Sequence, residues 1–302
     1  MISAMVRHGS NTDPQQLPAF ASTRDGPWRP RPKTPTHEVS LTVNQNTSRV
    51  SVVTVTFNNA SGLAATLGSL AALRHPPFEV VVVDGGSTDE TVRVVEGVGG
   101  ALPLRFVSGP DDGIYDAMNK GQRLARGELV HYLNAGDTVF GEPYERVRGP
   151  CRLPVQVLDE RGVLLFEDFV KHGGFGYCHQ GLLFPRDHAP YRTELRIAAD
   201  FDVIVATFPR GVLGLPKQAD GGVAFGLGGV STQRSEARDA EIRRVVRERL
   251  RGPRAWAILG LMVAKNALPR DVRRRLVAST HHVRAWAAGC SLTRGRRTGP
   301  RA

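Results

Sequence analysis

The sequence predicts an α/β fold in which a doubly wound, mostly parallel sheet is flanked by helices, and two observations indicate it. Between Val50 and Leu133, apolar runs typical of buried strands alternate with stretches whose apolar residues recur at helical spacing. Two of these strands lead into acidic residues, at Asp84 and at Asp137. Because open parallel sheets bind ligands beyond the carboxyl ends of their strands, we expect a functional site at that edge.

Local composition places the elements of this sheet. β-Branched and apolar runs such as Val80–Val83 are typical of strands that are buried on both faces. Ser87 and Glu90 have the spacing of a capping box, which predicts a helix that starts near Thr88. In order, the predicted elements are strand 50–56, helix 63–71, strand 78–83, helix 88–95, strand 104–107, helix 114–125, whose buried residues include Ile114, and strand 129–133.

After residue 140 the pattern is weaker. Two short apolar runs, 155–158 and 163–166, predict a small hairpin, and 182–184 predicts a further strand. An apolar helix is predicted from Val203 to Phe208, directly after Asp200 and Asp202. Residues Gly221–Gly229 are rich in glycine and predict a mobile loop.

Composition and charge divide the chain into three predicted domains. Residues 1–48 are rich in Pro, Thr, Ser, Asn and Gln, which predicts a disordered leader. Residues 49–232 carry the α/β pattern. Residues 233–302 form a basic, amphipathic helical extension, since 234–302 hold 18 basic and 5 acidic side chains of a chain whose net charge is +11. Such helices bind anionic membrane surfaces or form a cap with a solvated basic face, and both interpretations stay open.

The sequence also favours one compartment. Its three cysteines are far apart and form no CxxC pair, which argues against a disulfide framework and suits a reducing cytosol. The amino terminus lacks the apolar core of a signal peptide, and no apolar run approaches the ~18 residues that span a bilayer. We therefore expect a cytoplasmic protein that can bind the inner face of the plasma membrane peripherally.

Each candidate site residue has a structural explanation beside a functional one. Asp84 can accept from a base N–H or a ribose hydroxyl, or can form a turn before the next helix. Asp137 can hold a divalent cation on a diphosphate, or belong to an ordinary turn. Asp200 can deprotonate a hydroxyl, or cap a helix. His179 can contact a ligand, or be a buried structural histidine.

Seven short motifs follow one another along the chain. They are Val-Thr-Phe-Asn-Asn (55–59), Val-Asp-Gly-Gly-Ser-Thr-Asp (83–89), Asp-Gly-Ile-Tyr-Asp-Ala-Met-Asn-Lys-Gly (112–121), Gly-Glu-(x)4-Leu-Asn-Ala-Gly-Asp (127–137), Cys-His-Gln (178–180), Ala-Asp-Phe-Asp (199–202) and Gly-Gly-Val-Ser (228–231). Over roughly residues 50–231 the chain thereby resembles the family 2 glycosyltransferases with the GT-A fold. The third motif resembles members that assemble bacterial capsule, exopolysaccharide or glycolipid sugars.

The resemblance implies a reaction and a set of residues. It implies inverting transfer of a sugar from a nucleotide-sugar donor to a hydroxyl of a glycolipid, lipid-linked or polysaccharide acceptor in cell-envelope glycan synthesis. Asp200 would be the general base, and Asp137 would hold Mn²⁺ or Mg²⁺ as the cofactor. Contacts with the nucleotide sugar are implied for Thr56, Asp84, Asp111 and Asn134, and contacts with the acceptor or the donor sugar for His179 and Gln180.

Two motifs depart from the usual pattern of this family. Gly85 follows Asp84 where a second Asp is common, and Asn134 and Gly136 leave Asp137 as the only carboxylate of the metal motif. We therefore expect the cation to bind more weakly than in typical members, and the enzyme to be active.

Two other functions stay open. A non-catalytic scaffold that binds an anionic surface or nucleic acid through the Arg-rich tail would keep its salt-dependent binding after loss of Asp137 and Asp200. A nucleotidyltransferase would need a glycine-rich phosphate loop with basic residues after the first strand, and Asn58–Gly62 contains no basic residue. Nucleic acid is not the expected partner of the α/β domain, because residues 50–233 carry 16 basic and 21 acidic side chains.

Overall fold

The computed structural model describes residues 48–98, 100–159, 162–167, 174–226, 236–253 and 255–260. Three predictions fall largely outside these ranges: the leader at 1–48, the motif at 228–231 and most of the extension at 233–302.

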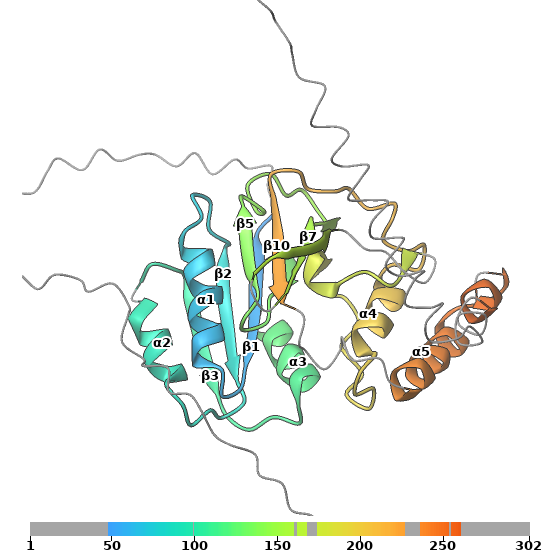
Figure 1. The fold of residues 1–302 in the computed structure, drawn as a ribbon, viewed down its shortest axis with the longest axis horizontal. Coiled ribbons are helices and arrows are strands. Elements are labelled where there is room, and N and C mark those ends of the chain that lie inside the picture. The colour runs from blue at the N-terminus through green and yellow to red at the C-terminus, as the bar shows by residue number, and fades with distance from the viewer. Residues whose placement is uncertain are drawn as a thin grey trace, which may run out of the picture. The chain divides into compact units, whose positions relative to one another are not determined.

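A six-stranded sheet with the order β3-β2-β1-β4-β9-β6 forms the centre of the described chain (Figure 1). Its first four strands are parallel, β9 pairs antiparallel with β4, and β6 pairs antiparallel with β9. Every residue of β1 and β2 is buried, as expected for strands covered on both faces. The predicted mostly parallel α/β sheet is therefore confirmed. The strands are β1 (Val50–Thr56), β2 (Glu79–Asp84), β3 (Leu104–Ser108), β4 (Leu129–Tyr132), β6 (Cys151–Arg152) and β9 (Leu182–Pro185).

Three helices connect the parallel strands, namely α1 (Ala60–Ala71), α2 (Thr91–Val98) and α3 (Ile114–Leu124). The helices α1 and α2 pack against each other, whereas α3 packs on β1 and β2 (Figure 1). The helix α2 begins at Thr91 rather than near Thr88, because Asp89, and not Ser87, accepts from the Thr91 N–H at 3.1 Å. The prediction that Ile114 is buried is also wrong, since 47% of this residue is exposed.

A second, four-stranded sheet has the order β5-β10-β7-β8 and was not foreseen as a separate sheet. Its strands are β5 (Thr138–Gly141), β7 (Val155–Leu158), β8 (Leu164–Glu167) and β10 (Gly221–Gly226). The predicted hairpin is confirmed by the antiparallel pairing of β7 and β8. The predicted mobile loop is wrong for residues 221–226, which form β10 between β5 and β7, while 227–229 lie outside the described ranges. A Cβ atom at Gly222 would overlap the Pro154 carbonyl oxygen, so glycine here permits close strand packing.

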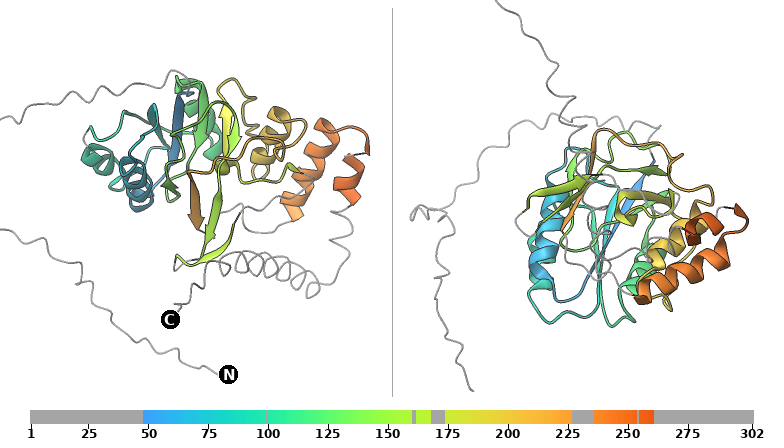
Figure 2. Two further views of the ribbon diagram at one scale, coloured as in Figure 1. Left: turned by 90° about the horizontal axis from the view of Figure 1, so that it is seen from above. Right: turned by 45° about the vertical axis from the view of Figure 1, so that its right-hand side comes forward.

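The helices α4 (Ala199–Thr207) and α5 (Glu236–Arg249) lie side by side (Figures 1 and 2). Ile242, Val245 and Val246 of α5 are buried, so its predicted apolar stripe faces the protein. Arg249 donates two hydrogen bonds of 2.9 Å to the fully buried Asp202 of α4. Where the structure describes the chain, it contains no helix that is both long and apolar enough to cross a membrane.

Candidate active site

The loops that follow β1, β2 and β4 are tied together at the carboxyl edge of the large sheet. The backbone N–H of Asn58 donates to the Ser87 hydroxyl at 2.7 Å, and its side-chain oxygen accepts from the Thr88 N–H at 2.9 Å. Asn59 donates to the Ala135 carbonyl at 3.1 Å. Asn58 has φ of 48°, a left-handed conformation that asparagine tolerates better than most residues. The hydrogen bonds of the two asparagines thus join the loops after β1, β2 and β4 into one surface, which we call the platform.

Asp84 lies at the centre of this platform and is fully buried. Its carboxylate accepts from the Ser87 hydroxyl, from the Ser87 N–H at 3.0 Å and from the Ser108 hydroxyl at 2.6 Å. These bonds join the loop after β2 to the end of β3. Asp84 therefore shapes the loop in the described conformation, and its contact with a nucleotide stays a prediction.

Asp111 lies beside Gly85, the residue at which the chain first departs from the family pattern. A Cβ atom at Gly85 would lie 2.9 Å from Asp111 Oδ2 and 3.2 Å from a ring carbon of Phe57. A second Asp at position 85 would therefore require the Asp111 carboxylate to move away. The Asp111 carboxylate also accepts from the Gly113 N–H at 2.9 Å, which shapes the loop in front of α3.

Phe57 is a candidate residue that sequence reasoning missed. Its ring is 63% exposed although it directly follows the buried strand β1. An exposed aromatic ring next to a carboxylate is a platform on which a nucleobase can stack. The available signal was a large aromatic residue at the carboxyl end of a strand, where open sheets bind ligands.

The Asn134–Asp137 turn is held by Thr66 of α1. The Thr66 hydroxyl donates to the Asp137 carbonyl at 2.7 Å and accepts from the Gly136 N–H at 3.0 Å. The Asp137 N–H closes the turn on the Asn134 carbonyl at 3.0 Å. Sequence reasoning did not identify Thr66, because its partners are about seventy positions away along the chain.

Replacing Thr66 by valine is expected to lower the free energy of unfolding by about 1–3 kcal/mol. The reason is that the Asp137 carbonyl and the Gly136 N–H lose the partly buried Thr66 hydroxyl as their partner while the side-chain volume hardly changes. Chemical denaturation of the variant measures the loss, and calorimetric titration with Mn²⁺ reports any change at the turn. Thr66→Ser keeps the hydroxyl and is the matched control. Equal destabilisation by both substitutions would contradict a role for the hydroxyl.

Asp137 lies close to Gln180 and His179, although 42 positions along the chain separate Asp137 from His179. Burial raises the pKa of Asp137 to about 7, and a hydrogen bond from the Gln180 side chain and the nearby His179 act in the opposite direction. His179 Nδ1 lies 3.9 Å from Asp200 Oδ2. The β4 turn, the 3-10 helix η2 (His179–Gly181) and the first turn of α4 thus meet at one place.

Polar side-chain atoms without a hydrogen-bond partner gather at the same place. Within the described ranges, the buried atoms without a partner include Asn134 Oδ1, His179 Nε2, Gln180 Oε1 and Tyr191 Oη, with Thr56 Oγ1 at the end of β1. Because buried polar groups in folded proteins are nearly always paired, such a group of atoms indicates that a polar ligand binds here. Four of these five residues were predicted to be site residues, and Tyr191 was not.

These residues fit a divalent cation of the Mn²⁺ or Mg²⁺ type. Such cations prefer oxygen ligands, and Asp137 offers a carboxylate while Asn134 offers an unpaired amide oxygen. The described part of the chain contains no group of three or more His, Cys, Asp or Glu residues arranged as a complete metal site. The remaining ligands of a cation at Asp137 would be water and substrate oxygens.

A buried histidine fixes the position of η2. His131 of β4 donates from Nε2 to the Gln180 carbonyl at 2.7 Å and accepts at Nδ1 from the Tyr144 hydroxyl at 2.7 Å. Burial lowers the pKa of His131 to about 4, so the ring is neutral near pH 7 and keeps this arrangement. His131 thereby positions Gln180 from the strand that also carries the Asn134–Asp137 turn.

The two carboxylates at the start of α4 have different surroundings. Asp202 is fully buried and ion-paired with Arg249, whereas the Asp200 side chain is 28% exposed and faces His179. The N-cap residue is Ala198, which provides no side-chain cap. Asp200 Oδ1 accepts from the Phe201 N–H at 2.7 Å in the first turn, while Asp200 Oδ2 is the oxygen that faces His179. Glu241 of α5 caps the helix instead, and its carboxylate accepts from the backbone N–H groups of residues 196, 197 and 198 at 2.8–3.0 Å. Asp200 therefore keeps one carboxylate oxygen, Oδ2, that accepts no hydrogen bond from the start of α4.

The site combines two kinds of group. Asp137, Gln180, His179 and Asp200 lie together between the β4 turn and α4. Thr56, Asp84 and Asp111 lie on the neighbouring ends of β1, β2 and the loop before α3. Oxygen ligands, an exposed carboxylate and unpaired hydrogen-bonding atoms together suit a ligand with both phosphates and hydroxyl groups.

Comparison with known proteins identifies a family and several relatives that this chain resembles. The family model described as Glycosyl transferase family 2 matches residues 51–147. Over 176 residues the chain is 31% identical to a PGL/p-HBAD biosynthesis glycosyltransferase of Mycobacterium bovis (strain BCG / Pasteur 1173P2). The similar region covers 52% of this chain and 69% of the mycobacterial protein.

Two solved structures share the fold at low sequence identity. The structure of S. aureus TarS 1-349 in complex with UDP-GlcNAc has a TM-score of 0.53 and 18% identity, and the match covers 71% of each chain. The structure of GalNAc-T7 with UDP, GalNAc and Mn²⁺ has a TM-score of 0.50 and 17% identity, over 68% of this chain and 48% of that one. The predicted GT-A type of fold is thereby confirmed.

Proposed function

This chain belongs to glycosyltransferase family 2, and on that basis we propose that it transfers a sugar from a nucleotide-sugar donor to a hydroxyl of a glycolipid, lipid-linked or polysaccharide acceptor, with inversion, in cell-envelope glycan synthesis. The observation that carries the proposal is the meeting of Asp137, His179, Gln180 and Asp200 in one polar cluster. The name of the mycobacterial relative, which refers to PGL/p-HBAD biosynthesis, supports a glycolipid acceptor.

The nucleotide would bind on the platform formed by the loops after β1 and β2. Thr56, whose hydroxyl is buried without a partner, and Asp111 would contact the base and ribose, and Phe57 would stack on the base. Asp84 would act on the nucleotide through the loop that its hydrogen bonds hold. The UDP-GlcNAc complex of TarS supports a nucleotide-sugar donor.

Asp137, assisted by the amide oxygen of Asn134, would hold Mn²⁺ or Mg²⁺ at the diphosphate. When bound, such a cation neutralises the negative charge that develops on the departing diphosphate. The Mn²⁺ in the GalNAc-T7 structure supports this cofactor. The Gln180 side chain lies near Asp137 and would orient the carboxylate.

Asp200 would remove the proton from the acceptor hydroxyl as that oxygen attacks the anomeric carbon. Attack from the side opposite the leaving diphosphate inverts the configuration at that carbon. Asp200 suits this role because it is partly exposed, whereas the neighbouring Asp202 is bound to Arg249. His179, 3.9 Å from Asp200, would keep the carboxylate directed at the acceptor.

The helical extension would bring the enzyme to its acceptor at the cytoplasmic face of the plasma membrane. Trp256, which is 74% exposed, follows the basic helix α5, whose Arg244 and Arg247 are also exposed. Exposed aromatic and basic side chains together are typical of helices that bind anionic membrane surfaces. Sedimentation with anionic and with neutral vesicles would test this part of the proposal.

A donor panel tests the proposed reaction. The full chain is incubated with UDP-, GDP- and dTDP-sugars with and without Mn²⁺, and binding and slow donor hydrolysis are measured. We expect one nucleotide series to bind and to be hydrolysed in a cation-dependent manner. If no nucleotide sugar binds under any cation, the catalytic assignment fails and a scaffold that acts through the basic extension becomes the better explanation.

A further inference from the structure

Tyr191 has a buried hydroxyl for which the fold provides no partner. The residue is 2% exposed, and its hydroxyl oxygen forms no hydrogen bond in the structure. A buried hydroxyl without a partner costs stability, so such a group is expected to bind a ligand. Burial, with Tyr132 and Asp200 nearby, raises the pKa of Tyr191 well above its ordinary value, so the hydroxyl keeps its proton and can donate.

The backbone of Tyr191 is held in place by Asn119 of α3. The Asn119 side chain donates to the Tyr191 carbonyl at 2.8 Å and accepts from the Tyr191 N–H at 2.8 Å. Tyr115, on the same helix, stacks on the Tyr191 ring with the centroids 5.5 Å apart and the planes 14° apart. The motif at 112–121 thus clamps both the backbone and the ring of Tyr191.

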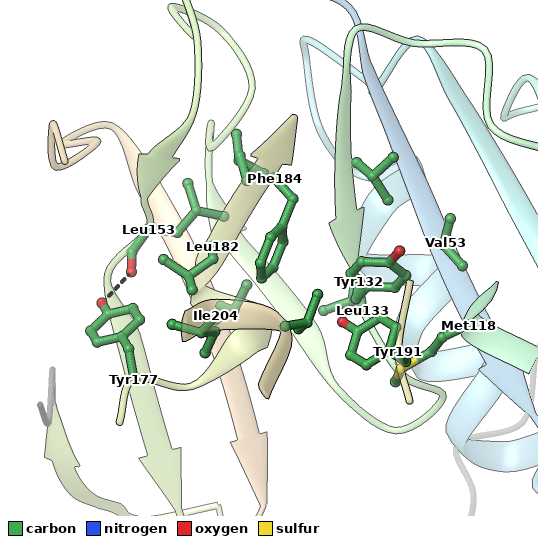
Figure 3. Close-up of a cluster of buried hydrophobic side chains, with 14 of the residues drawn as sticks. Val53, Met118, Tyr132, Leu133, Leu153, Tyr177, Leu182, Phe184, Tyr191 and Ile204 are labelled. Carbon is green, nitrogen blue, oxygen red and sulfur yellow. Dashed lines mark hydrogen bonds between the residues drawn. The ribbon is translucent and has the colours of Figure 1, made fainter. Parts of the chain in front are cut away.

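The ring of Tyr191 lies among residues of the polar cluster. It packs edge-on against Tyr132, with the ring centroids 5.1 Å apart (Figure 3). It also packs edge-on against His179, with the centroids 6.2 Å apart. Tyr191 also interacts electrostatically with Asp200. In a displacement with inversion the transferred sugar must lie between the diphosphate, which the Asp137 side would hold, and the base Asp200. Tyr191 lies next to His179, which faces both carboxylates.

We infer that the Tyr191 hydroxyl donates a hydrogen bond to a hydroxyl of the transferred sugar, and that α3 positions it through Asn119 and Tyr115. The inference rests on the proposed function. It also assigns a role to the most specific motif of the chain: its helix orients a residue of the sugar site about seventy positions away.

The test compares Tyr191→Phe with the wild type in the full chain. The two probes are the nucleotide sugar that the donor panel identifies and the matching nucleoside diphosphate, which lacks the sugar. Calorimetry is expected to show binding of the nucleotide sugar that is about tenfold weaker, which is about 1.4 kcal/mol. Binding of the nucleoside diphosphate is expected to be unchanged. Equal affinity of both proteins for the nucleotide sugar would overturn the inference and leave the proposed function intact.

Thermal unfolding without ligand separates this role from a structural one. Tyr177→Phe is the matched control, because the Tyr177 hydroxyl is buried and donates to the Leu153 carbonyl at 2.8 Å (Figure 3). Loss of that bond is expected to lower Tm by about 2–4 °C. Tyr191→Phe is expected to keep or raise the wild-type Tm, since no internal bond is lost and a buried hydroxyl without a partner is removed. A fall equal to that of Tyr177→Phe would overturn the inference. A wild type that binds no nucleotide sugar would instead refute the proposed function, and this inference with it.

Discussion

Replacing Asp200 by asparagine is expected to lower kcat for sugar transfer by about two to four orders of magnitude. Asparagine has nearly the same shape but cannot accept a proton, so the acceptor hydroxyl would have to attack without a base. The donor is expected to bind as in the wild type, because Asp200 lies on the acceptor side of the proposed site. Steady-state kinetics with the donor from the panel measures kcat, and calorimetry measures donor affinity.

Asp202→Asn is the matched control on the same helical turn. Asp202 is fully buried and receives two hydrogen bonds from Arg249, so asparagine removes the buried charge and replaces one of the two acceptor oxygens with an N–H donor that faces the guanidinium. We expect this variant to lose about 3–5 kcal/mol of stability and Asp200→Asn to lose little. If Asp200→Asn kept wild-type kcat, or lost activity only in proportion to lost stability, the role of general base would be refuted.

Replacing Asp137 by asparagine is expected to reduce cation-dependent activity about a hundredfold or more and to stabilise the ligand-free protein at pH 8. Activity falls because the carboxylate proposed to hold the cation is lost. Stability rises because burial raises the pKa of Asp137 from 3.8 to about 7. Between these two values the folded state holds a proton that the unfolded state has released. The stabilisation from the raised pKa is therefore complete below about pH 4 and is lost as the pH rises through 7.

The size of this effect follows from the pKa difference. About three pKa units correspond to about 4 kcal/mol between low pH and pH 8, which is an upper estimate for a group that is not completely enclosed. Chemical denaturation of both proteins with a chelator, at pH 5 and at pH 8, measures the part of this effect that lies between these pH values, about two pKa units or about 3 kcal/mol. The free energy of unfolding of Asp137→Asn is expected to increase relative to that of the wild type as the pH rises. Asp187→Asn removes an exposed carboxylate and is the control. A pH dependence identical to that of the wild type would contradict the burial of Asp137.

Much of the fold could be predicted from local patterns, because its central elements bury whole faces. The run Val80–Val83 is apolar at every position since β2 is covered on both faces, and the helical spacing after Ile114 reflects a helix packed on that sheet. Prediction failed where a residue type serves several purposes. The glycines of Gly221–Gly226 permit close strand packing as well as they permit a loop, and only the neighbouring strands distinguish the two uses.

The sequence by itself determined the family, the mostly parallel sheet and the residues that are candidates for the site. Only the tertiary structure decided which groups face one another. It paired Asp202 with Arg249, capped α4 with Glu241 and so left Asp200 facing His179. It also joined Thr66 to the turn at Asp137 and Asn119 to Tyr191. Each of these contacts connects residues that are more than forty positions apart along the chain, except the contact between His179 and Asp200, which are closer in sequence. No local pattern of apolar and polar residues records such contacts, because they depend on how packed elements approach one another.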